Sequence, residues 1–84
     1  MPDAARHELI LPDLGLGETP IIASTWLKRP GSLVIEGDRL LEVHAGSVTV
    51  DLPAPASGIL AQTLVQENEG LHVGQPLAVI ESRG

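Results

Sequence analysis

An internal repeat constrains the fold of this 84-residue chain more than any other feature of its sequence. When the sequence is shifted by 37 positions, apolar residues and turn glycines fall on residues of the same kind. The matched pairs are Ile22 with Ile59, Leu27 with Leu64, Val34 with Leu71, Gly37 with Gly74, Leu40 with Leu77, and Val43 with Ile80. One such unit cannot bury its own apolar face, so two packed units must share a core. The repeat predicts two halves related by an approximate twofold axis.

Each unit favours strands over helices. No window of about 11 residues carries an apolar face at helical spacing without Gly or Pro in it. The nine Gly and seven Pro residues indicate short elements joined by tight turns. We expect an all-β domain over residues 8–82, a flattened barrel or sandwich of two small antiparallel sheets, with residues 1–7 as a flexible tail. The expected strands are 8–11, 21–27, 34–37, 39–43, 48–52, 59–65 and 77–81.

A β-hairpin centred on Gly46 is predicted to join the two halves. Residues 40–43 form an apolar run before the turn, and residues 48–52 alternate apolar and polar side chains after it. That alternation is the period of a strand with one buried face. Gly46 can adopt the positive φ that tight hairpin turns require, and Pro53 ends the ladder. Ser47, at the turn, should therefore be held in solvent on two paired strands.

The core must consist of aliphatic side chains, because the chain has no Phe or Tyr. Trp26 is the only aromatic residue, and a Trp in a strand most often lies in the core or at its edge. The residues expected to be buried are Ile22, Val34, Leu40, Val50, Ile59, Leu64, Leu77 and Val79.

Composition excludes several classes of function. The net charge is −6, and the bases Arg6, Lys28, Arg29, Arg39 and Arg83 form no basic patch, so nucleic acid is not an expected partner. The chain has no Cys and hence no thiol chemistry or disulfide. No apolar run approaches the roughly 18 residues of a membrane span, and a reducing cytoplasm is the expected compartment.

Several motifs, in this order and spacing, resemble a lipoyl domain of the biotinyl/lipoyl carrier fold, a barrel-sandwich hybrid. They are Leu11-Pro12-Asp13-Leu14-Gly15, Trp26-Leu27-Lys28, Gly37-Asp38-x-Leu40-x-Glu42-Val43, Val48-x-Val50-x-x-Pro53-Ala54-Pro55-x-x-Gly58, and Gly74-x-x-Leu77. The resemblance covers residues 8–82. It points to the acyltransferase component of 2-oxo acid and acetoin dehydrogenase complexes.

The resemblance implies a swinging-arm carrier. In the family, a lysine at the hairpin tip holds lipoate through an amide, and the cofactor shuttles an acyl group. The arm visits the decarboxylase, the transferase and the dihydrolipoamide dehydrogenase, which makes the decarboxylase and the dihydrolipoamide dehydrogenase the implied partners. The domain itself is then not an enzyme, because the chemistry belongs to the cofactor.

The sequence departs from the family at the tip. The family has Glu, Thr, Asp and Lys where this chain has His44, Ala45, Gly46 and Ser47. Gly31, which lies 16 residues before Ser47, and Gly58, 11 residues after it, match the two glycines that flank the tip in the family. A hydroxyl cannot form the amide, so we expect no lipoate on this sequence. Lys28, the only lysine, lies in another segment and is not expected to replace the missing one.

Two function classes stay open. The first is a carrier module related to acyltransferase components, inactive or altered in this copy. The second is a cofactor-free interaction or scaffold domain that uses the lipoyl fold. A biotin carrier is disfavoured, because that tip reads Met-Lys-Met.

Other candidate residues carry weaker signals. His44 could act as a base on Ser47 across the turn, but an orienting third group is missing and a surface histidine is the preferred interpretation. The three histidines share no metal-ligand spacing, and no metal site is expected. Leu14, Leu16 and Glu18 lie in the loop that flanks the carrier hairpin in lipoyl domains, where it contributes to recognition; an ordinary exposed loop is the equal alternative.

Overall fold

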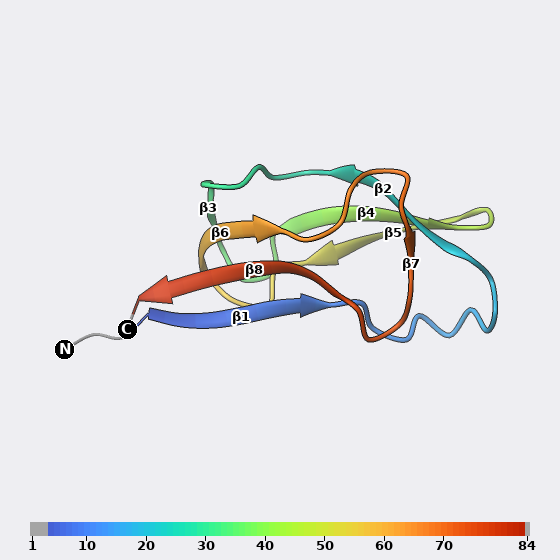
Figure 1. The fold of residues 1–84 in the computed structure, drawn as a ribbon, viewed down its shortest axis with the longest axis horizontal. Coiled ribbons are helices and arrows are strands. Elements are labelled where there is room, and N and C mark those ends of the chain that lie inside the picture. Colours follow the sequence, from blue (N-terminus) through green and yellow to red (C-terminus); the bar gives the residue numbers. More distant parts are fainter. Residues whose placement is uncertain (1–3, 84) are drawn as a thin grey trace.

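The computed structural model describes residues 4–83, and within that range it contains eight strands and no helix. The strands form two antiparallel four-stranded sheets, with orders β1-β8-β6-β3 and β5-β4-β2-β7 (Figure 1). The strands are β1 (Ala4–Ile10), β2 (Ile21–Trp26), β3 (Leu33–Val34), β4 (Arg39–Ala45), β5 (Val48–Pro53), β6 (Gly58–Thr63), β7 (Gly70–Leu71) and β8 (Pro76–Arg83). The expected all-β class with two small sheets is confirmed.

The shift of 37 residues relates strands as well as sequence. It carries β2 onto β6, β3 onto β7, and the start of β4 at Arg39 onto the start of β8 at Pro76. When each strand is replaced by its equivalent in the other repeat, the order β5-β4-β2-β7 becomes β1-β8-β6-β3, with β1 in the position that corresponds to β5. The repeat therefore has the structural meaning expected of it, because each half contributes strands to both sheets.

The turns of the two repeats also coincide. Gly37 and Gly74 have φ values of 94° and 89°, and each donates its N–H to a carbonyl of the neighbouring segment. The N–H of Leu27 donates to a carbonyl at 2.8 Å, and so does that of Leu64. These hydrogen bonds satisfy backbone groups where the strands end, which lets short strands terminate inside a small domain.

The core lies between the two sheets and draws on both halves. Leu40 and Leu77, which are equivalent in the repeat, are both completely buried. The largest fully buried side chains are Leu11, Leu40, Leu41, Leu60, Leu77, Ile80, Val43 and Val79. Expected burial is confirmed for Val34, Leu40, Leu77 and Val79. Val50 is half-buried and packs against the core, as Trp26 does at its edge.

Three residues expected in the core are exposed instead. Ile22, Ile59 and Leu64 have exposed fractions of 37%, 37% and 44%. In β2 the inward positions are Ile21 and Ala23, so strand alternation turns Ile22 outward. Ile59 is its equivalent in β6 and points outward for the same reason. The repeat aligned these residues correctly, but sequence similarity between repeats does not say which face is buried.

Most strand ends lie within three residues of the expected ones, and the expected strand 34–37 is the two-residue β3 followed by a turn. Two differences are larger. β1 begins at Ala4, so residues 4–7, expected in the flexible tail, pair with β8 through Ala4↔Arg83 to His7↔Ile80. Arg6 and His7 are tolerated in this segment because β1 is an edge strand. β7 was not expected, although it is the counterpart of β3 in the repeat. Residues 1–3 of the expected tail lie outside the described residues.

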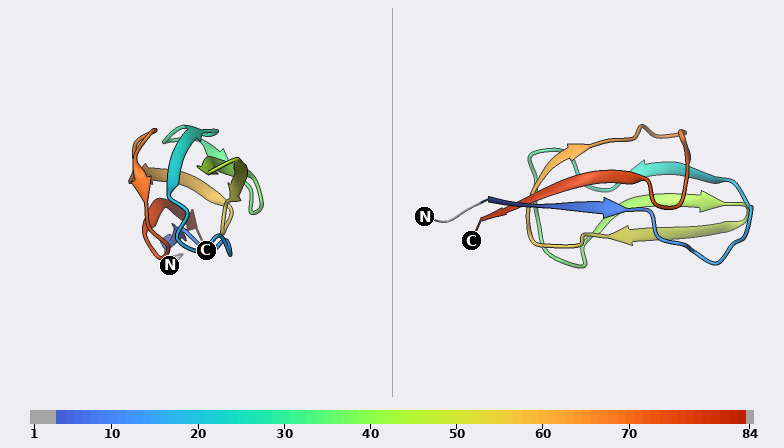
Figure 2. Two further views of the ribbon diagram at one scale, coloured as in Figure 1. Left: turned by 90° about the vertical axis from the view of Figure 1, so that its right-hand side faces the viewer. Right: turned by 60° about the horizontal axis from the view of Figure 1, so that its bottom comes forward.

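The molecule is elongated, about 46 Å by 19 Å by 18 Å. The β4–β5 hairpin reaches one end of the long axis, and the paired ends of β1 and β8 form the other (Figures 1 and 2). The described residues include no helix that could span a membrane. We call these two regions the tip end and the terminal end.

Candidate functional site

The tip of the β4–β5 hairpin is a two-residue turn. Ala45 pairs with Val48, and this leaves Gly46 and Ser47 as the connection between the strands. Gly46 has a φ of 63°, whereas Ser47 does not have a positive φ. This pattern is that of a type II′ turn, whose first central position favours Gly and whose twist suits paired strands. Ser47 is exposed, as the sequence predicted.

The strands below the tip are anchored in the core. Ala45 and Val43 are buried, with exposed fractions of 3% and 0%. Ala45 also pairs with Ile21 of β2, so β4 lies between two strands up to its last residue. The hairpin therefore presents Ser47 from a support that is hydrogen-bonded on both sides of β4.

The loop of residues 11–20 lies beside the tip. A Cβ placed on Gly46 would lie 3.6 Å from Cγ2 of Thr19. Leu14 and Leu16 are half-buried and pack against the core, whereas Glu18 is exposed. The two leucines thus anchor the loop, while Glu18 stays exposed beside the hairpin. Packing of the two leucines on the core accounts for apolar residues in an otherwise exposed loop.

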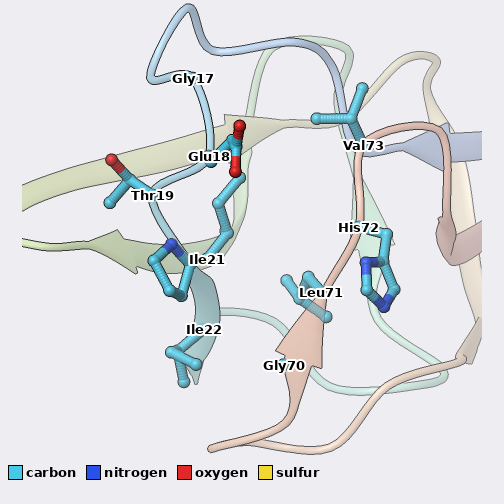
Figure 3. Close-up of a pocket in the computed structure, with 10 residues that line it drawn as sticks. Gly17, Glu18, Thr19, Ile21, Ile22, Gly70, Leu71, His72 and Val73 are labelled. Atoms are coloured by element: carbon cyan, nitrogen blue, oxygen red, sulfur yellow. The ribbon is translucent and has the colours of Figure 1, made fainter.

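An open groove of about 410 Å³ lies next to the tip. One wall comes from residues 17–22 and the other from residues 70–73, which include β7 (Figure 3). Its side chains are mixed: Ile22 and Val73 are exposed apolar residues, and Glu18 and His72 are polar. The residues 70–73 were not identified from the sequence. The repeat was the available signal, since it maps β3 onto β7.

His44 does not act on Ser47 in this structure. The His44 Nε2 atom lies 3.3 Å from Oε1 of Glu42, and Ser24 Oγ donates to the same carboxylate oxygen at 3.0 Å. Ser47 has no hydrogen bond to His44 among the described residues. The geometry favours the interpretation of His44 as a surface side chain of β4. No cluster of three or more metal-ligating side chains occurs in the part of the chain that the structure describes.

The expected site residues fall into two groups. His44, Gly46 and Ser47 lie together at the tip end. Gly31 and Gly58 lie where β3 pairs with β6, close to the terminal end (Figure 1). Gly31 has a φ of 93° and donates its N–H to Leu60 O at 2.7 Å. Gly58 packs so closely on β8 that an added Cβ would clash with the Glu81 carbonyl. Both glycines shape the scaffold and do not surround Ser47.

A flattened barrel of two repeated halves, joined by one exposed two-residue hairpin, is the architecture of the biotinyl- and lipoyl-carrier domains. Domains of this class present a bound group and leave the chemistry to it. A family model described as "Biotin-requiring enzyme", the biotin/lipoyl family, matches residues 7–80. The chain belongs to this family.

Similar proteins are acyltransferase components of multienzyme systems. The chain is 35% identical over 74 residues, 88% of its length, to the dihydrolipoyllysine-residue acetyltransferase component of the acetoin cleaving system of Pseudomonas putida. It is 33% identical over 73 residues, 87% of its length, to the succinyltransferase component of the 2-oxoglutarate dehydrogenase complex of Bacillus subtilis. The chain covers only 20% and 18% of these relatives, about a fifth of their lengths.

Solved structures support the fold. The lipoyl domain of the 2-oxoglutarate dehydrogenase complex from Azotobacter vinelandii is similar with a TM-score of 0.64, 22% identity, and coverage of 88% of this chain and 89% of that one. Part of a multi-domain long-chain acyl-CoA carboxylase has a TM-score of 0.65 at 20% identity, over 93% of this chain and 7% of that one. The barrel-sandwich hybrid expected from the sequence is therefore the fold of this chain.

Proposed function

We propose that this chain is a lipoyl-type carrier domain, related to dihydrolipoamide acyltransferase components, whose tip cannot be lipoylated. The observation that carries the proposal is the exposed Gly46-Ser47 turn, which is where the family's lysine would be held. Lipoylation requires a primary amine, because the cofactor is attached as an amide. Ser47 offers only a hydroxyl, so the tip has no amine to which lipoate could be attached.

The rest of the chain does not replace the missing amine. Lys28 lies 19 residues before Ser47 in the sequence and follows the end of β2 at Trp26. β2 begins beside the tip, where Ile21 pairs with Ala45, and runs away from it. Lys28 thus lies toward the terminal end, distant from the turn that would have to be presented to the ligase.

The proposed partners follow from the relatives. If the chain works within an acyltransferase component, it would contact the decarboxylase and dihydrolipoamide dehydrogenase components of that complex. The groove beside the tip supplies a contact surface that needs no cofactor, since the anchored loop and Glu18 form one of its walls. This groove supports the alternative that the domain is a cofactor-free interaction or scaffold module.

A lipoylation assay tests the proposal. The purified chain is incubated with lipoate, ATP and a lipoate ligase, and its intact mass is measured. We expect no added lipoyl mass on the unaltered chain, and partial modification of the Ser47→Lys variant under the same conditions. That variant is the positive control, because it restores only the amine. A lipoyl adduct on the unaltered chain, at any residue, would refute the proposal.

A pull-down separates the two function classes. Decarboxylase and dihydrolipoamide dehydrogenase components are offered to the immobilised, unmodified chain. Binding that is lost in Glu18→Lys and kept in Glu36→Lys would favour the interaction module, because Glu36 is an equally acidic surface residue outside the groove. Absence of binding would remove these two components as partners of the unmodified chain, and lipoylation of Ser47→Lys would then favour the carrier relationship.

A further inference from the structure

Exposed apolar side chains gather on β3, away from the tip. Leu33 and Ile35 have exposed fractions of 77% and 68%, the highest among the large apolar residues that the structure describes. Leu33 lies opposite Ile59 of β6, which is 37% exposed. We call these three residues the β3 patch. Contiguous exposed apolar side chains on a small domain commonly mark an interaction surface.

The fold itself does not require apolar residues at these positions. In the other repeat, Gly70 is equivalent to Leu33 and His72 is equivalent to Ile35. The local turn is similar in both repeats. The N–H of Ile35 donates to the Asp38 side chain, and the N–H of His72 donates to the Gln75 side chain, each over 2.9 Å. Since a small and a polar residue occupy the equivalent positions of the second repeat, the local backbone does not account for the apolar side chains of the first.

Charge is distributed unequally along the molecule. Around the β3 patch both signs occur: Lys28 and Arg29 precede β3, Glu36 follows it, and Glu81 lies opposite Ile59 and 3.8 Å from Arg6. The tip end has acids but neither Lys nor Arg in residues 11–20, 43–50 and 68–76. Two copies of this chain, each with a net charge of −6, would therefore repel each other more strongly at their tip ends than at the β3 patch.

We propose that the β3 patch is the contact of a weak, twofold-symmetric dimer of this chain. In such an isologous contact each copy offers the same surface, so Leu33 and Ile35 would pack against the same residues of the second copy. The mixed charges around the patch allow Lys28 or Arg29 of one copy to face Glu36 of the other. A partner with charges of only one sign would repel the side chains of that sign around the patch. A second copy of this chain brings both signs, so a homodimer suits this surface.

The dimer would leave the carrier hairpin free. The patch lies toward the terminal end of the long axis, and the Gly46-Ser47 turn lies at the other end (Figure 1). A contact through β3 therefore leaves both tips outside the interface. This inference does not rest on the proposed function, because it concerns a different surface.

The patch predicts weak association. Three partly exposed side chains cover much less than the roughly 800 Å² per partner of a standard interface. We expect a dissociation constant of about 0.1 to 1 mM. Added salt should strengthen the dimer, because it screens the repulsion between two acidic chains more than it weakens the apolar contact.

Sedimentation equilibrium and heteronuclear NMR over about 0.05 to 2 mM protein, a range that spans the expected dissociation constant, test the proposal. The weight-average mass should rise above the 8.8 kDa of the monomer. Amide shifts should change with concentration in residues 28–36, 57–60 and 81, and stay constant in residues 43–50. A mass that stays at 8.8 kDa over the whole range would overturn the proposal, as would shifts confined to the tip end.

Matched variants locate the contact. Leu33→Thr with Ile35→His should raise the dissociation constant about tenfold or more, because two apolar side chains leave the contact. His is the residue that the second repeat already tolerates at the equivalent position, and the formal charge is unchanged. Ile22→Thr with Val73→Thr removes two exposed apolar side chains from the tip end and should leave association unchanged. Equal effects of the two double variants would contradict a dimer through β3.

Discussion

Gly31 and Asn68 occupy the same backbone position in the two repeats. Their φ values are 93° and 74°, and Asn68 is the only residue other than Gly with positive φ in the described chain. Each donates its N–H over 2.7 Å, Gly31 to the Leu60 carbonyl and Asn68 to the Ala23 carbonyl. Asn tolerates the left-handed region better than most residues. This turn therefore requires a residue that can adopt positive φ, but it has room for a side chain.

The first prediction follows from this equivalence. Gly31→Asn should change the free energy of unfolding by less than about 1 kcal/mol, whereas Gly31→Val should cost about 1 to 3 kcal/mol, the range for a strained backbone. No atom lies within 4 Å of a Cβ placed on Gly31, so the difference measures backbone conformation and not crowding. Urea denaturation of the two variants is the measurement. Equal losses would show that the position is limited by space.

The second prediction concerns the core. Leu40→Ala and Leu77→Ala should each cost about 2 to 5 kcal/mol, the usual range for truncating a fully buried leucine. Leu64→Ala is the control and should cost less than about 1 kcal/mol, because 44% of Leu64 is exposed and less apolar area is lost. Denaturation curves compare the three variants. A loss below about 1 kcal/mol at both Leu40 and Leu77 would mean that neither supports the core.

The third prediction concerns close packing at the start of β6. Gly58→Ala should destabilise the domain by about 1 to 3 kcal/mol or more, because the added Cβ would collide with backbone atoms of Glu81 and Ser82 in β8. Gly70→Ala is the matched control, since nothing lies within 4 Å of its added Cβ and its φ is not positive. It should be neutral within about 1 kcal/mol. Thermal unfolding of both variants tests this, and similar melting temperatures would contradict the close approach.

Much of this architecture could be predicted from the sequence, because its determinants are local. Gly46 between two apolar runs indicated the hairpin, and the alignment of Gly37 with Gly74 indicated two equivalent turns. These signals depend on backbone geometry, which a few residue types control. The position of Ser47 at an exposed tip follows from the same local geometry.

The choice of buried face could not be predicted from the repeat alone. Ile22 and Ile59 are apolar in both units yet lie on the outer faces of their strands. Leu40 and Leu41 are adjacent and both buried, because the pairing of β4 with β5 shifts register between Arg39 and Leu41. A bulge of this kind breaks simple alternation and is set by partner strands distant in sequence.

The groove at the tip could not be predicted from local sequence patterns either. Its walls are residues 17–22 and 70–73, which the sequence separates by nearly fifty positions. Ile21 and Ile22 pair with Leu71 and Gly70, and only this tertiary pairing brings the two segments together. The short β7 carries no strand-like pattern of its own.

The fourth prediction is the order in which tip variants gain lipoylation. Ser47→Lys should be modified in part, and Ser47→Lys with Gly46→Asp more fully, because the carboxylate beside the lysine resembles the family's tip. The Gly46 position has ordinary space, with Thr19 Cγ2 3.6 Å from an added Cβ, but its φ of 63° strains a side chain there. The double variant should therefore be less stable than Ser47→Lys by about 1 kcal/mol.

Adding His44→Glu restores the family's glutamate at this position of the tip but also introduces repulsion between like charges. His44 Nε2 lies 3.3 Å from the Glu42 carboxylate, so a glutamate at this position would place two like charges on one face of β4. Adding Glu42→Gln as a fourth substitution relieves that repulsion and keeps a group that can accept the Ser24 hydrogen bond. We expect modification by a lipoate ligase, read as intact mass, to rise from the single to the double to the triple variant. Two-dimensional NMR checks that each variant is folded. A folded triple variant that stays unmodified would mean that the scaffold has lost the carrier role, and would favour the interaction module.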